Sequence, residues 1–341
     1  MSAQRRRLGS WALCLACAAL AAATARGQQV PTVRALESPW PERVVIEGVE
    51  IVHVQRNVYM LVGAGANVTV QHGDEGVVIV DSGAPGQTER LLAAVRRLTR
   101  RPVRYLINTG PDPDHIGGNG EIVKSAGARL PNTGRAGGPP SNVGTSVIAH
   151  ENAYNRMIAG TPLLPPLTGE ALPESTFFTP RKDIFVNGEP VQLLFQPNAH
   201  TDGDLLVFFR GSDVVSAGQI YRTDGYPMID ASRGGSIQGV LDALNMLLEI
   251  TVPERNQMGG TRVVPAYGRV SNEADVVEYR DMLTIIRDRV QAMVAKGLTL
   301  EQVKAARPTL EYDGIYGKRT AWTGEMFLEA VYRDLSQTTK K

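Results

Sequence analysis

The sequence predicts an α/β (α+β) protein, folded as a four-layer αβ/βα sandwich with extra helices at the C-terminal end. Three observations favour this architecture. Short β-rich runs lead into a helical segment in the first half of the chain, and the same order of parts returns in the second half. Two halves of this kind suit two sheets packed face to face with helices outside them. The third observation is a helical tail, which starts with a long 3.6-residue apolar period from Asn272 to Lys296.

The first half begins at Arg43 with β-rich runs that glycines punctuate, as hairpins require. Its predicted strands are 44–46, 51–55, 58–62, 67–71, 77–80 and 103–107. Apolar residues at helical spacing predict a helix over 87–99, and a second helix is expected over 146–158. Two stretches rich in Gly or Pro, 128–146 and 161–180, are expected to be irregular.

The second half repeats the pattern and then continues into helices. Its predicted strands are 184–186, 191–195, 205–209, 214–217 and 262–265, with a helix over 237–250 before the last of them. In the tail, Thr299-Leu300-Glu301-Gln302 fits a capping box that starts a short helix, and an apolar face marks another helix over 323–337. We therefore expect residues 43–270 to form the sandwich and residues 271–341 to form a helical extension packed on the same domain.

The first part of the chain, residues 1–25, has the pattern of an export signal. A basic start at 5–7 precedes an apolar run over 8–20 and a small-residue cleavage site at 23–25. Nothing like a stop-transfer segment follows, which favours a cleaved signal over a membrane anchor. The mature chain is expected to be periplasmic or secreted, to keep no stable membrane anchor, and to begin with an irregular lead-in over 26–42.

Composition excludes several classes of function. Both cysteines, Cys14 and Cys17, lie inside the predicted signal, so a mature chain has no thiol for nucleophilic catalysis, zinc binding or disulfides. The 36 basic residues fall to 33 once the three arginines of the signal are removed, against 35 acidic residues. The resulting net charge of about −2 offers no electrostatic attraction to nucleic acid or to an anionic membrane.

One loop carries three side chains of the kinds that hold metals. The run from Asn108 to Asn119 follows the predicted strand 103–107, and Asp112, Asp114 and His115 fall within four residues of each other. The two prolines of the run restrict φ and push the residues before them away from helix, so the side chains are held on a stiff loop.

Five separated landmarks, in this order, resemble the metallo-β-lactamase superfamily. They are Val80-Asp81-Ser82-Gly83, the loop around Asp112, Ala199-His200-Thr201-Asp202-Gly203-Asp204, Ser216-Ala217-Gly218-Gln219 and Pro265-Ala266-Tyr267-Gly268. The loop is similar to the His-x-His-x-Asp-His run of that family. The resemblance covers roughly residues 43–332. It implies an αβ/βα fold whose edge loops collect up to two zinc ions, which activate water to hydrolyse amides, esters, lactones or thioesters.

The resemblance also assigns ligand positions. They fall, for the first metal, on Gly110, Asp112 and His200, for the second on Asp114, His115 and Tyr267, and for a bridging carboxylate on Gln219. Asp112 replaces an imidazole with a hard oxygen ligand. Gly110 has no ligating side chain, and Gln219 is a weak neutral ligand. Tyr267 is a poor zinc ligand, because a phenol keeps its proton up to about pH 10.

One metal site is expected from what remains. Asp112, Asp114, His115 and His200 offer the ligands that a single catalytic zinc needs, with Asp114 as the general base. Two histidines and a carboxylate would equally suit iron(II) or manganese. The alternative is a site without metal, in which Asp114 and His115 form a hydrogen-bonded pair that supports the loop. Asp81 is expected to orient the loop through backbone N–H groups.

Two hypotheses about function follow. The first is an exported hydrolase of an ester, lactone or amide with a mononuclear metal site. The second is a non-catalytic relative that has lost the dinuclear zinc site and keeps the sandwich as a binding module. Both imply a small-molecule substrate or ligand. Convergence of the two carboxylates and the two imidazoles on one shared ion would favour the first hypothesis.

Overall fold

The computed structural model describes residues 44–125, 144–160, 165–257, 259–319 and 321–338. The predicted signal peptide, the lead-in and both cysteines lie outside the described residues, as does most of the predicted irregular stretch 128–146. Residues Glu42–Lys341 form one compact unit. No helix in the described ranges is long and apolar enough to span a membrane.

The first sheet has eight strands, which lie side by side in chain order. They are β1 (Val44–Ile46), β2 (Val49–Gln55), β3 (Val58–Val62), β4 (Val68–Gly73), β5 (Gly76–Val80), β6 (Val103–Ile107), β7 (Ser146–His150) and β8 (Ser175–Phe177). β1 to β5 pair antiparallel, and β5 to β8 pair parallel. β5 is buried along its whole length, which explains its unbroken run of Val and Ile.

The second sheet has five strands in the order β13-β12-β11-β10-β9. They are β9 (Arg181–Val186), β10 (Glu189–Gln196), β11 (Asp204–Phe209), β12 (Val214–Ser216) and β13 (Arg262–Val264). All neighbours pair antiparallel except β12 and β13, which are parallel. Hydrophobic side chains of both sheets share one buried cluster, which includes Val80 and Ile107 from the first sheet and Leu205 and Val207 from the second.

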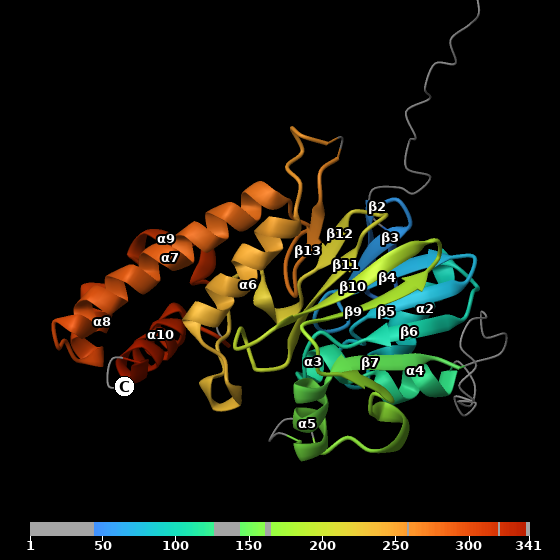
Figure 1. The fold of residues 1–341 in the computed structure, drawn as a ribbon, viewed down its shortest axis with the longest axis horizontal. Coiled ribbons are helices and arrows are strands. Elements are labelled where there is room, and N and C mark those ends of the chain that lie inside the picture. The colour runs from blue at the N-terminus through green and yellow to red at the C-terminus, as the bar shows by residue number, and fades with distance from the viewer. Residues whose placement is uncertain (1–43, 126–143, 161–164, 258, 320, 339–341) are drawn as a thin grey trace, which may run out of the picture. The chain divides into compact units, whose positions relative to one another are not determined.

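Helices cover the outer faces of both sheets, which confirms the predicted two-sheet α/β sandwich. Figure 1 shows α2 and α4 beside the first sheet and α6 and α7 beside the second. The helices are α2 (Thr88–Leu98), α3 (Pro113–Ile116), α4 (Asn119–Ser125), α5 (Glu151–Ala159), α6 (Ile237–Ile250), α7 (Glu273–Ala295), α8 (Leu300–Ala306), α9 (Leu310–Tyr316) and α10 (Gly324–Thr338).

The C-terminal helices share a core with the second sheet. Leu206 of β11, Val240 of α6, Val276 of α7 and Phe327 of α10 belong to one buried cluster, so these helices are packed on the sandwich. The predicted capping box at the start of α8 is present: the Thr299 side chain accepts from the Gln302 N–H, and the Gln302 side chain accepts from the Thr299 N–H.

Three sequence-based expectations differ from the structure. The predicted helix over 146–158 is a strand, β7, followed by the helix α5, because Val147 and Ile148 pair with β6 as a buried parallel strand. A short buried apolar run has no periodicity that separates strand from helix. Part of the predicted irregular stretch 161–180 forms β8 and a 3-10 turn at Gly169–Ala171. The helix α9 was not predicted.

The landmark loops meet at one edge of the sandwich. Asp81 follows the end of β5, and the Asn108–Asn119 loop follows the end of β6. Gln219 lies in a 3-10 turn just after β12, and Tyr267 follows β13. His200 precedes β11, whose start lies opposite the end of β12 because the two strands are antiparallel. The topology therefore brings segments far apart in the sequence to one edge.

Candidate functional site

The central loop turns directly into the short helix α3. Asp112 is its N-cap, and the carbonyl oxygen of Asp112 accepts from the N–H groups of His115 (2.9 Å) and Ile116 (3.1 Å). Pro113 occupies the first helical position, where its missing N–H costs nothing. The Asp112 side chain makes no capping bond, so its carboxylate is available to other partners.

A buried polar network holds this loop against the neighbouring strand. The Ser82 hydroxyl donates to Asn119 Oδ1 (2.8 Å), and Ser82 Oγ accepts from the Gly118 N–H (3.0 Å). Asn108 and Asn119 exchange two side-chain bonds of 3.1 Å and 2.9 Å. Ser82, Asn108 and Asn119 are fully buried, and Gly118 is buried as well. The bonds between Asn108 and Asn119 tie the start of the loop to its end, and those of Ser82 tie the end of the loop to the segment after β5, so the loop is held rigid.

Asp81 joins the loop to His115. Its backbone has a φ of 65°, a region that non-glycine residues rarely adopt and that recurs at functional sites. Asp81 Oδ1 accepts from the Thr109 N–H (2.8 Å), while Oδ2 accepts from the Thr109 hydroxyl (2.7 Å) and from His115 Nδ1 (2.6 Å). Asp81 therefore orients both the loop backbone and the imidazole.

His115 is buried, with its side chain 1% exposed. Burial by itself lowers the pKa of His115, but the charge and hydrogen bond of Asp81, with smaller contributions from Asp114 and Asp112, raise it to about 9. Its Nε2 atom is buried and has no hydrogen-bond partner within the described part of the chain.

Asp112, His200 and Arg233 form a closed cluster. His200 Nε2 donates to Asp112 Oδ2 (2.8 Å), and Arg233 donates to Asp112 Oδ1 (2.6 Å). His200 Nδ1 lies 2.9 Å from the Met228 carbonyl oxygen, and Arg233 Nε also donates to Asp230 (2.7 Å).

The charges within this cluster stabilise one another. Burial opposes ionisation of Asp112, but the positive charges of His200 and Arg233 hold the pKa of that carboxyl well below its usual range. Burial likewise lowers the pKa of His200, whereas the charge and hydrogen bond of Asp112 raise it to about 9. A carbonyl and a carboxylate only accept, so both ring nitrogens of His200 carry protons.

Asp114 does not join His115. It accepts a hydrogen bond from the Tyr267 hydroxyl instead. Burial and the charge of Asp114 raise the pKa of Tyr267 above its ordinary value, so the phenol keeps its proton. The guanidinium carbons of Arg222 and Arg319 lie 4.8 Å and 5.0 Å from the centroid of the Tyr267 ring. The Tyr267 hydroxyl is therefore hydrogen-bonded to a carboxylate, and two guanidinium groups lie over its ring.

The remaining predicted positions are buried beside this cluster. A Cβ atom on Gly110 would lie 3.2 Å from Asp204 Oδ1, so an acidic group faces the place where the family has a histidine. Asp204 accepts from the Thr201 N–H (2.7 Å) and hydroxyl (2.9 Å), and burial raises its pKa to about 6. Gln219 is 7% exposed.

These bonds decide whether the predicted ligands fit a metal ion. A ligand must offer a lone pair, and His200 offers none because both its ring nitrogens donate. Each oxygen of Asp112 already accepts a bond from a positively charged side chain. The Arg233 guanidinium beside Asp112 would repel a cation. Across the described ranges, no group of three or more His, Cys, Asp or Glu side chains is placed to hold a metal. The four side chains are distributed over three separate clusters, and in this arrangement they do not fit a single metal.

Sequence reasoning missed the arginines of this site. Arg222 lies three residues beyond Gln219, and Arg233 ends the short 3-10 helix Ala231–Arg233 before α6. Arg319 comes from the chain between α9 and α10, far along the sequence. No spacing or periodicity marks any of them, because single basic residues in loops are usually solvated. Only the fold reveals that they lie beside the loop landmarks.

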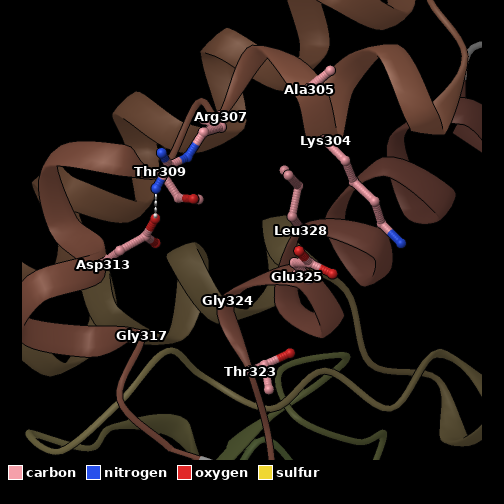
Figure 2. Close-up of a pocket in the computed structure, with 10 residues that line it drawn as sticks. All are labelled: Lys304, Ala305, Arg307, Thr309, Asp313, Gly317, Thr323, Gly324, Glu325 and Leu328. Atoms are coloured by element: carbon pink, nitrogen blue, oxygen red, sulfur yellow. Dashed lines mark ion pairs between the residues drawn. The ribbon is translucent and has the colours of Figure 1, made fainter.

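A separate hollow lies among the C-terminal helices. It has a volume of about 500 Å³ and is lined by residues that include Lys304 and Arg307 near α8, Asp313 of α9, and Glu325 of α10. Figure 2 shows Arg307 and Asp313 pointing toward one another, with 4.0 Å between their charged groups. None of the predicted site residues lines this hollow. We place the candidate site at the loop edge, where the buried charges are.

Comparisons with known proteins support the family resemblance of the sequence. The family model of the metallo-β-lactamase superfamily matches residues 61–254. A linear primary-alkylsulfatase from Pseudomonas sp. (strain ATCC 19151) is 25% identical over 255 residues, which are 67% of this chain and 47% of that protein. The chain therefore spans about half the length of this curated relative.

Solved structures share the fold at low sequence identity. A stereoselective inverting sec-alkylsulfatase from Pseudomonas sp. aligns with a TM-score of 0.60 and 15% identity, over 83% of this chain and 49% of that one. A metallo-β-lactamase from Pontibacter korlensis aligns with a TM-score of 0.52 and 16% identity, over 69% of this chain and 99% of that one. The resemblance predicted from the landmarks is confirmed, and the family model covers more than half of the chain. The protein belongs to the metallo-β-lactamase superfamily.

Proposed function

We propose that the protein is an exported binding module for a small molecule, and that it works without a metal ion. The observation that most supports this is the closed set of bonds around Asp112. His200 and Arg233 occupy its two carboxylate oxygens at 2.8 Å and 2.6 Å. A guanidinium thus lies where a metal ion would need a free carboxylate oxygen, in the part of the fold where the superfamily has its metal centre.

Opening this cluster to a metal would be costly. The side chains are 1% exposed for His200, 10% for Asp112 and 16% for Arg233, so their charges are only weakly screened by water. Breaking a buried ion pair by removing one partner costs about 3–5 kcal/mol. A metal would have to displace Arg233 from Asp112 and take a proton from His200. Binding of a neutral or anionic ligand requires neither change.

Metal content tests the proposal directly. The protein is purified without chelator and analysed by inductively coupled plasma mass spectrometry. We expect less than about a tenth of an equivalent of zinc, iron or manganese. A metal that binds only the folded state stabilises it, so removing such a metal with EDTA would lower the unfolding temperature. Because we expect no bound metal, EDTA should leave the unfolding temperature unchanged. One equivalent of metal, with a lower unfolding temperature after chelation, would contradict a metal-independent module.

A gain-of-metal variant supplies the matched control. Gly110→His/Asp112→His restores two of the imidazoles that the family places at these positions. We expect this variant to bind more zinc than the wild type, since it removes the carboxylate that pairs with Arg233 and adds two nitrogen ligands. If both proteins hold the same full equivalent of zinc, the metal does not depend on the altered loop and the proposal fails.

A second candidate function, metal-dependent ester hydrolysis, is favoured by one feature of His115. Asp81 binds its Nδ1 atom, and the buried Nε2 atom has no partner among the described residues. A carboxylate that orients an imidazole in this way is common behind metal ligands. The similarity to an alkylsulfatase makes a sulfate ester the first substrate to try.

Hydrolysis of an alkyl sulfate, with and without added zinc or manganese, tests this second candidate. We expect no turnover above background from wild-type protein. A measurable rate that His115→Ala abolishes, while the variant keeps its circular dichroism spectrum at the assay temperature, would overturn the binding module and favour the hydrolase.

Export has its own test. N-terminal sequencing of protein from the periplasmic or secreted fraction should find a mature chain that begins near residue 26. A chain that begins at Met1 and stays with the cytosolic fraction would exclude export without bearing on metal or ligand binding.

A further inference from the structure

Arg222 is a buried cation whose hydrogen bonds are incomplete. Its side chain is 1% exposed, and its Nε–H donates to Asp224 Oδ1 at 2.8 Å. The two terminal nitrogens, Nη1 and Nη2, are buried and have no hydrogen-bond partner in the described part of the chain. A guanidinium carries five N–H donors, so most of them are unused here. A buried unsatisfied group of this kind points to an acceptor that the protein itself does not supply.

The charges around Arg222 are balanced, with two guanidiniums and two carboxylates near the Tyr267 ring. Arg319 also donates to Asp224, so two guanidiniums share one carboxylate. The other nearby carboxylate, that of Asp114, is engaged by the Tyr267 hydroxyl. The neutral phenol leaves the charge of Asp114 in place, so the site lacks hydrogen-bond acceptors for Nη1 and Nη2 of Arg222, and the oxygens of an oxyanion supply them.

The ring of Tyr267 fixes where the donors lie. Both guanidinium carbons lie within 5.0 Å of its centroid, the range of a cation–π contact. The bond from Tyr267 to Asp114 fixes the ring, and Asp224 fixes both arginines from another side. Donors that are oriented before binding lose little entropy when the ligand arrives.

We propose that Arg222 and Arg319 form a subsite for an oxyanion group of the ligand: a carboxylate, a sulfate or a phosphate. The flat fork of a guanidinium matches two oxygens of such a group, which a single ammonium does not. Arg319 and Asp224 are 30% and 34% exposed and form the solvent-exposed part of the subsite, whereas Nη1 and Nη2 of Arg222 are buried. This inference rests on the proposed function, because it names the charge of the small molecule that the module binds.

Calorimetric titration with sodium sulfate at constant ionic strength, with chloride as the balancing salt, tests the subsite. We expect saturable sulfate binding to the wild type and no comparable binding of added chloride. Arg222→Lys keeps the charge but loses the fork, and should weaken sulfate binding at least tenfold. Arg101→Met removes an exposed arginine that is paired with Asp74, and should bind sulfate like the wild type. Acetate and phosphate, titrated in the same way, identify which oxyanion is preferred.

A second variant keeps the proposal falsifiable if Arg222→Lys does not fold. Arg319 is partly exposed, so Arg319→Met should fold, and we expect it to weaken sulfate binding at least threefold. Absence of saturable sulfate binding to the wild type would overturn the subsite. Equal affinities in the wild type and in both folded variants would also overturn it, and would mean that water molecules satisfy Arg222.

Failure of the subsite and failure of the proposed function can be distinguished. All titrations use protein treated with EDTA, and metal content is measured separately on untreated protein. If the protein is metal-free and binds no sulfate, the subsite is excluded but the proposal of a metal-independent module stands. If the protein holds one equivalent of metal, the metal-independent module is excluded. The subsite is then still tested by the sulfate affinities of the Arg222→Lys and Arg319→Met variants.

Discussion

The two buried histidines of the site are held in different ways. His115 and His200 are each 1% exposed, and in each case the charge of an aspartate outweighs burial and raises the pKa to about 9. His200 uses both ring nitrogens, for Asp112 and for a backbone carbonyl. His115 uses Nδ1 for Asp81 and leaves Nε2 without a partner among the described residues. His200 therefore has no further hydrogen bond to offer, whereas His115 is open to one more contact.

The largest expected effect comes from breaking the contact between Asp81 and His115. Asp81→Asn removes the charge that pairs with His115 and disturbs the bonds to Thr109, all in a buried setting. We expect the free energy of unfolding, measured by urea denaturation, to fall by about 3–5 kcal/mol. Asp74→Asn is the matched control, because Asp74 is fully exposed and pairs only with Arg101 at 3.4 Å. It should cause no measurable change. Equal effects of the two variants would mean that Asp81 does not hold His115.

The next effect is a loss of stability at high pH. The pKa of both histidines is raised from 6.5 to about 9 in the folded state, so their protonated forms favour folding. This stabilisation is complete below pH 6.5 and is lost as the pH rises through about 9. We expect each histidine to account for a fall of at most about 3 kcal/mol in the free energy of unfolding across this window.

Two variants divide this pH dependence between the two histidines. Asp81→Asn should remove the share of His115, and Asp112→Asn should remove the share of His200. Denaturation curves at several pH values measure each share. A wild-type stability that stays constant from pH 6.5 to pH 9 would show that neither histidine is a buried cation.

Arg233→Met weakens the cluster of Asp112 and His200, and its expected loss of stability is smaller. It removes the 2.6 Å bond to Asp112 but leaves His200 as a partner of that carboxylate. We expect the free energy of unfolding to fall by about 2 kcal/mol, the range of a hydrogen bond to a charged group. Arg156→Met is the control, since Arg156 pairs with Asp202 at 2.8 Å but is 36% exposed. A larger loss in the control than in Arg233→Met would contradict the closed cluster.

The sequence predicted the sandwich because its signals are local. Runs of Val and Ile, punctuating glycines and the capping box at Thr299 each depend on neighbouring residues, and all of them appear in the structure. The strand β7 was misread as helix, because a buried parallel strand carries no alternation. Local sequence pattern therefore predicts the layers of the sandwich. It fails where pairing with a strand distant in sequence decides whether a segment is strand or helix.

The candidate site was predictable in position but not in bonding. The landmarks placed Asp81, Asp112 and His200 at one edge, and the fold places them there. No sequence signal shows that Arg233 bonds to Asp112 or that Tyr267 bonds to Asp114, because these contacts join residues more than a hundred positions apart. The sequence gives the residue types at these positions, but the hydrogen-bond partner of each side chain depends on the fold.

The smallest expected effect tests the space beside Gly110. A Cβ atom on Gly110 would lie 3.2 Å from Asp204 Oδ1, so that carboxylate must shift by a few tenths of an ångström. Gly110 does not have a positive φ, so alanine is not strained there and reduces the entropy of the unfolded chain. These contributions oppose each other, and we expect Gly110→Ala to change the free energy of unfolding by less than about 0.5 kcal/mol.

Gly218→Ala supplies the contrast for this test. Gly218 has a φ of 49°, and its Cβ atom would lie 2.5 Å from Thr109 Oγ1, the hydroxyl that donates to Asp81. We expect it to lose more than about 1 kcal/mol, because both backbone strain and a steric clash oppose the side chain. Urea denaturation compares the two variants. If Gly110→Ala costs as much as Gly218→Ala, Asp204 cannot yield, and the site has no room for the imidazole that the family carries at this position.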